Sequence, residues 1–127
     1  MTNWLLELNE HTREKVFAEM RSLRQKSDSY LTSANQLQPK YGEIAAGGVH
    51  IDAFARGEAL AVFLRCLSTG DTPQVALEKA NTEAELIFDN WNKSRKDYQV
   101  HRNLKSLSSF LQTISITFAQ LRRTHEG

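Results

Sequence analysis

The sequence contains few of the residues that interrupt helices or cross-link chains. Its 127 residues include two prolines, six glycines and one cysteine, and neither proline nor glycine occurs between Pro73 and the terminal Gly127. The single cysteine, Cys66, excludes an internal disulfide and any zinc site built on several cysteines. Because helix breakers are rare while Leu, Ala, Glu, Lys and Gln are common, the composition favours an all-helical chain.

Long apolar runs are also missing. No uninterrupted stretch reaches the length of a membrane span, and acidic residues follow soon after a start that lacks the basic residues of a secretory signal. Hydrophobic residues make up 40% of the chain and charged residues 24%, which is ordinary for a soluble domain. We therefore expect one helical domain over residues 1–127, a cytoplasmic location and no membrane partner.

Charge is balanced overall but unevenly distributed. Residues 43–92 contain three basic and eight acidic residues, whereas residues 93–123 contain seven basic residues and one acidic residue. The acidic middle and the basic end could neutralise each other within the fold, or they could face different partners.

A heptad seam near the C-terminus is the clearest structural signal. Apolar residues alternate at spacings of three and four along it: Leu104, Leu107, Leu111, Ile114, Phe118 and Leu121. This spacing predicts a helix that buries one stripe against other helices. No charged residue occurs between Ser106 and Leu121, although a solvated helix usually carries Lys and Glu on its outer face. The seam therefore indicates packing and self-association, and we expect a homodimer.

Similar spacing and helix-end signals predict the other helices. A thinner seam, which includes Val16, Leu23 and Ser27, indicates a long first helix that ends at Pro39. Thr72-Pro73 is a typical helix start. The regular helical spacing of apolar residues is interrupted between residues 92 and 103, which predicts that the helix breaks there. We predict a four-helix bundle with helices over residues 3–37, 51–69, 73–93 and 100–123, in which the first and last lie alongside each other.

The sequence offers little catalytic chemistry. The four histidines are isolated, and none forms the Glu-x-x-His or His-x-x-x-His pairs that hold metals on helices. No pattern typical of a serine nucleophile occurs either. We therefore expect no enzyme activity, no metal and no cofactor.

A basic tract with interleaved aromatic residues is the strongest polar signal. We assign partner binding to seven of its residues: Trp91, Lys93, Arg95, Lys96, Tyr98, Arg102 and Lys105. Cations beside aromatic rings suit phosphate backbones and exposed bases, so nucleic-acid binding through residues 93–105 is the alternative. The tract could also simply pair with the acidic segment at residues 78–89.

Taken together, these features predict a non-enzymatic interaction module. It would act as a small adaptor, regulator or inhibitor by binding another protein or protein complex, with the opposite charges of its two regions setting the orientation of the encounter.

Overall fold

The computed structural model describes residues 3–45, 49–94 and 100–126, and the side chains of residues 3–36, 51–90 and 104–123. Within these ranges the chain forms five helices and no strand: α1 (Trp4–Glu7), α2 (Glu10–Ala45), α3 (Val49–Ser68), α4 (Pro73–Ser94) and α5 (Val100–Glu126). The predicted all-α bundle is confirmed. No helix in the described part is both long and apolar enough to cross a membrane.

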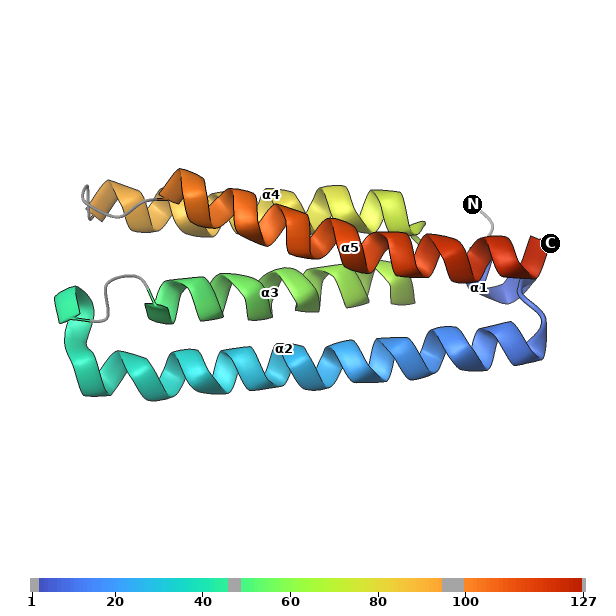
Figure 1. The fold of residues 1–127 in the computed structure, drawn as a ribbon, viewed down its shortest axis with the longest axis horizontal. Coiled ribbons are helices and arrows are strands. Elements are labelled where there is room, and N and C mark those ends of the chain that lie inside the picture. The colour runs from blue at the N-terminus through green and yellow to red at the C-terminus, as the bar shows by residue number, and fades with distance from the viewer. Residues whose placement is uncertain (1–2, 46–48, 95–99, 127) are drawn as a thin grey trace.

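The helices pack as antiparallel neighbours (Figure 1). Helix α2 runs the length of the molecule, α3 lies along it, and α4 and α5 lie on the other side of α3. The most extensive described contacts join α2 to α3, α3 to α4 and α4 to α5, while α2 meets α5 over a smaller area. The first and last long helices therefore touch, as expected.

Aromatic residues from three helices form the centre of the core. Phe63 of α3, Phe88 of α4 and Phe118 of α5 are fully buried, and the rings of Phe63 and Phe118 lie 5.6 Å apart between centroids. Burying each such side chain contributes about 2–3 kcal/mol. Toward the other end of the bundle, Tyr30 of α2 meets Phe110 of α5 edge to face at 6.3 Å. These two ring contacts join α5 to α3 and to α2.

The turn between α3 and α4 follows directly from its sequence. Gly70 has a φ of 99°, a conformation that side-chain-bearing residues rarely adopt. The amide of Gly70 donates to the carbonyl of Leu67 at 3.1 Å, and the amide of Asp71 donates to the carbonyl of Cys66 at 2.9 Å. This pair of bonds is a Schellman cap, and Thr72 then caps α4 through its hydroxyl. The predicted turn and helix start are confirmed.

The prediction of one continuous first helix from residue 3 is wrong at its N-terminal end. Leu8 is extended and separates α1 from α2. The Asn3 side chain accepts from the amide of Leu5, and the Asn9 side chain accepts from the amide of Thr12, so each helix has its own cap. Two closely spaced caps start two helices where hydrophobic spacing alone suggested one.

The predicted helix end at Pro39 is also wrong, because α2 continues to Ala45. A proline within a helix removes one backbone hydrogen bond and typically bends the helix without necessarily ending it. Figure 1 shows the last part of α2 turning out of line with the rest.

The helix break in the C-terminal half lies between residues 92 and 103, as the interrupted apolar spacing predicted. Helix α4 ends at Ser94 and α5 begins at Val100. Helix α5 also extends past the predicted end at residue 123, to Glu126. On α4, Ala76, Ala80, Ala84 and Phe88 are fully buried, and Ile87 is partly buried against the same core.

Candidate interaction surface

The basic tract surrounds the connection between α4 and α5. Six of its seven assigned residues have side chains outside the described residues: Trp91, Lys93, Arg95, Lys96, Tyr98 and Arg102. The seventh, Lys105, is exposed on the first turns of α5. Partner binding through this tract stays a prediction.

The seam residues lie inside a single chain. Leu107, Leu111 and Phe118 are fully buried, and Leu104, Ile114 and Leu121 pack against the same core. Their spacing thus predicted a buried stripe correctly. Self-association through these side chains stays a prediction, and it would require two copies to share or exchange α5.

The side of α5 that faces away from the core is exposed and uncharged. We call this surface the outer face of α5, and it consists of Ser106, Ser109, Gln112, Thr113, Ile116 and Gln120. Ile116 is 49% exposed, and Leu6 and Leu86 elsewhere on the molecule are more exposed, at 72% and 54%. The Thr113 hydroxyl donates to the carbonyl of Ser109 at 3.1 Å, so it is already bonded within the helix. Because none of these six residues is charged, covering this face would remove no charge of its own from water.

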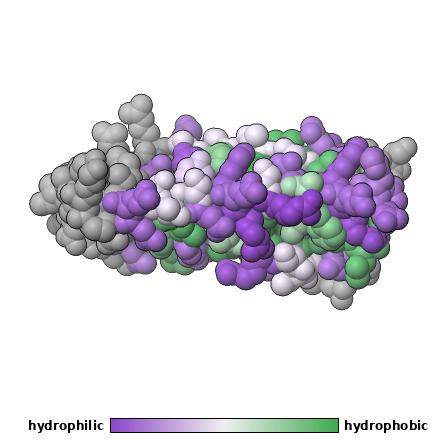
Figure 2. Space-filling model, turned by 90° about the horizontal axis from the view of Figure 1, so that it is seen from below, coloured by the Kyte–Doolittle hydropathy of each residue, from purple (hydrophilic) through white to green (hydrophobic). Residues whose placement is uncertain are grey.

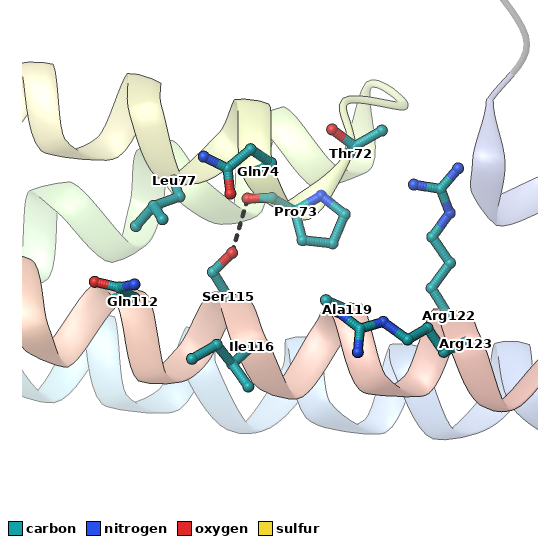
Figure 3. A pocket seen from close by; sticks show the side chains of 10 residues that line it. All are labelled: Thr72, Pro73, Gln74, Leu77, Gln112, Ser115, Ile116, Ala119, Arg122 and Arg123. Atoms are coloured by element: carbon teal, nitrogen blue, oxygen red, sulfur yellow. Dashed lines mark hydrogen bonds between the residues drawn. The ribbon is translucent and has the colours of Figure 1, made fainter.

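A groove lies between this face and the start of α4 (Figure 3). We call it the α4–α5 groove. It has a volume of about 490 Å³, and its lining residues are Thr72, Pro73, Gln74, Leu77, Gln112, Ser115, Ile116, Ala119, Arg122 and Arg123. The buried Ser115 hydroxyl donates to the Pro73 carbonyl at 3.1 Å and joins the two walls. Figure 3 shows Leu77 and Gln112 toward one end of the groove and the two arginines toward the other.

One of these arginines is held in place by an aromatic ring. The Arg122 guanidinium lies 5.8 Å from the centroid of the Trp4 ring, within the range of a cation–π contact. The Trp4 indole N–H donates to the carbonyl of Asp71 at 2.7 Å. Trp4 therefore joins α1, the turn before α4 and the end of α5. Neither Arg122 nor Arg123 forms an ion pair with another described residue.

A second groove between α2 and α3 has a different charge. This α2–α3 groove has a volume of about 400 Å³ and includes Arg24, Arg65 and Asp28 among its lining residues. The carboxylate of Asp28 offsets part of the basic charge there. Figure 2 views the molecule from the α2 side and shows hydrophilic side chains over much of this face, with hydrophobic ones in separate small areas.

The titratable groups with shifted pKa values lie outside both grooves. Lys79 forms an ion pair with Asp71 at 2.8 Å, which lowers the pKa of Asp71 and raises that of Lys79. Burial raises the pKa of the Cys66 thiol, so the thiol stays protonated and weakly nucleophilic at neutral pH. Among the described side chains, no three His, Cys, Asp or Glu groups gather closely enough to hold a metal ion.

Sequence reasoning identified the uncharged outer face of α5 but not the α4–α5 groove. Arg122 and Arg123 follow the seam, and nothing in their spacing shows that the start of α4, some fifty residues earlier, lies beside them. Comparison with family models, with curated proteins and with solved structures found no match for this chain.

Proposed function

We propose that this chain is a non-enzymatic helical module that binds another protein or protein complex, as an adaptor, regulator or inhibitor. The observation that carries this proposal is the outer face of α5, which is exposed, uncharged and contains the half-exposed Ile116. The centres of protein interfaces are depleted in charged residues, whereas ordinary solvated helix faces are rich in them. A partner is the simplest physical reason for this difference.

Charge would orient the encounter. Residues 104–123 of α5 carry Lys105, Arg122 and Arg123 and no acidic residue, while the exposed side of α4 carries Glu78, Glu85 and Asp89. Such separated charges change association rates and docking orientation more than affinity. We therefore expect binding to be faster at low salt, with a weaker effect on the stability of the complex.

A cytoplasmic location belongs to the same proposal. The single thiol is buried and unpaired with any other cysteine, which suits a reducing compartment. A homodimer is a further part of it, because a second copy could also cover the outer face of α5.

Affinity purification of a tagged chain from its own host tests the proposal. We expect a protein partner to co-purify with the unsubstituted chain and to be lost, by about tenfold or more, with Ile116→Lys, because a buried lysine charge is costly at an interface centre. Ser22→Lys is the matched control, since Ser22 is exposed on α2 and the substitution adds the same charge. Equal recovery of the same proteins with the unsubstituted chain, Ile116→Lys and Ser22→Lys would contradict the proposal.

A further inference from the structure

We infer that the α4–α5 groove binds an acidic segment of the partner, with a carboxylate at Arg122 and Arg123 and a neighbouring apolar side chain against Leu77 and Ile116. This inference rests on the proposed function and adds the chemistry of the partner to it.

The charge of the α4–α5 groove is complementary to that of a carboxylate. The only charged groups that line the groove in the described part of the chain are the guanidinium groups of Arg122 and Arg123. Guanidinium groups bind carboxylates through parallel, charge-assisted hydrogen bonds. Because no described acidic residue pairs with either arginine, a carboxylate from a partner would not have to displace an internal ion pair.

The walls of the α4–α5 groove and one of its arginines are held in place by contacts within the chain. Arg122 is positioned by its contact with the Trp4 ring, and Trp4 is itself fixed by its hydrogen bond to the turn before α4. The Ser115–Pro73 hydrogen bond fixes the spacing of the two walls. A site that is already ordered loses less conformational entropy when a ligand binds.

The apolar wall distinguishes a peptide from a nucleic acid. Leu77, Ile116, Ala119 and Pro73 line the groove beside the arginines, and these groups suit an aliphatic side chain rather than a phosphate backbone. Nucleic-acid binders usually combine many cations with exposed rings on which bases stack. The aromatic residue beside this groove, Trp4, is only 3% exposed and lies under Arg122.

Titration of the ¹⁵N-labelled chain with a designed peptide tests the inference. The probe is a capped peptide of about a dozen residues built only from Leu and Glu, and its counterpart carries Lys in place of every Glu. We expect the Glu peptide, at concentrations up to about 1 mM, to shift the backbone amides of residues 74–77 and 112–123. The Lys peptide should leave these amides unchanged.

Charge-reversed variants make the test specific. Arg122→Glu/Arg123→Glu should weaken binding of the Glu peptide about tenfold or more, because two charge-assisted contacts are lost. Arg24→Glu/Arg65→Glu, in the α2–α3 groove, makes the same change in net charge and should change the affinity less than about twofold. The single variant Arg123→Glu leaves the Trp4–Arg122 contact intact. If this variant also binds the Glu peptide more weakly, the weakening cannot come from misfolding of α1.

Three outcomes would overturn the inference. The first is that the Glu peptide shifts none of the backbone amides of the groove. The second is that both double variants weaken binding of the Glu peptide equally. The third is that a single-stranded oligonucleotide binds at the same arginines more tightly than the Glu peptide does. None of these outcomes bears on the affinity-purification result with Ile116→Lys. A partner that depends on Ile116 but not on Arg122 and Arg123 would support the proposed function and reject this inference alone.

Discussion

At the scale of single residues, Gly57 sets the distance between α2 and α3. A methyl group added at this position would lie 2.6 Å from Cγ of Leu31 and 3.1 Å from the backbone oxygen of Ser27. The buried Ser27 hydroxyl donates to the Gly57 carbonyl at 2.8 Å, which requires the same close approach. The close approach of Ser27 and Gly57 therefore explains why the seam of the first long helix contains a small polar residue.

We expect Gly57→Ala to lower the free energy of unfolding by about 1 kcal/mol. Overpacking of a filled site costs roughly 1–3 kcal/mol, and the better helix propensity of alanine returns about 1 kcal/mol of this. Chemical denaturation followed by circular dichroism measures the difference. Leu31→Ala in the same chain should recover part of the loss because it removes the nearest atoms. A Gly57→Ala chain as stable as the original would show that α2 and α3 separate easily.

The Asp71–Lys79 pair gives a prediction about pH. The ion pair lowers the pKa of Asp71 below its ordinary value of 3.8 and raises the pKa of Lys79 above 10.5. Its small stabilising effect should be present at neutral pH, disappear as the pH falls through the lowered pKa of Asp71, and disappear again as the pH rises through the raised pKa of Lys79. Both side chains are reached by solvent, so we expect only a slight change in stability.

An NMR titration of the Asp71 carboxyl carbon measures this effect directly. In Lys79→Gln the pKa of Asp71 should rise relative to the unsubstituted chain, because the largest cause of its lowering, the hydrogen bond from Lys79, is lost. Identical titration curves for the two chains would mean that the ion pair does not persist in solution.

At the level of elements, one side chain from α2 makes several bonds to α1, in addition to the contacts of Trp4. The Arg13 guanidinium donates to the carbonyls of Leu5, Leu6 and Leu8, at 3.1, 3.2 and 2.8 Å. These carbonyls belong to α1 and the residue that follows it, and the Leu5 carbonyl also accepts from the amide of Leu8 at 3.4 Å. Arg13 therefore closes the corner between the two helices.

We expect Arg13→Ala to release α1 and leave the rest of the bundle folded. Loss of the three bonds should cost about 1–3 kcal/mol, within the range for hydrogen bonds to charged groups. Hydrogen exchange measured by mass spectrometry should speed up in residues 3–8 and stay unchanged in α3. Arg21→Ala is the control, because Arg21 is exposed on the same helix. Unchanged exchange at residues 3–8 would show that the contacts of Trp4 hold α1 without Arg13.

The elements also show which parts of the fold could be predicted. Periodicity located the buried stripe of α5 and the break before it, because hydrophobic spacing directly reflects burial. It missed the corner at Leu8, since apolar spacing continues across two adjacent caps. It also missed the continuation of α2 past Pro39, because proline disfavours a helix locally while tertiary packing can override that preference.

At the scale of the whole molecule, one chain covers its own seam. All six seam residues lie in or against the core of the single chain. The seam is therefore not free to form an interface, and the proposed homodimer would use the outer face of α5 instead. For this homodimer we expect multi-angle light scattering at micromolar concentration to give about twice the chain mass of 14.5 kDa, and Ile116→Lys to lower the measured mass. A mass near 14.5 kDa for the unsubstituted chain would contradict the homodimer and leave the outer face of α5 to a different protein.

The candidate surface could be predicted only in part. An uncharged stretch of helix is visible in the sequence, so the outer face of α5 could be recognised from Ser106 to Leu121. The α4–α5 groove brings together residues from two separate parts of the chain, and its ordering depends on Trp4, which lies 67 residues before its bonding partner Asp71. Such placement is a property of the folded chain and not of any local pattern.

Site-specific photo-cross-linking in the host cell tests whether another protein covers the outer face of α5, as proposed. A photoreactive benzoylphenylalanine replaces the exposed Thr113 in one chain and the exposed Ser22 of α2 in a control chain. We expect the chain with the photoreactive residue at position 113 to form a discrete adduct with a second protein, and the chain with it at position 22 to form none. No adduct from position 113, the same adducts from both positions, or an adduct with nucleic acid alone would contradict the proposal.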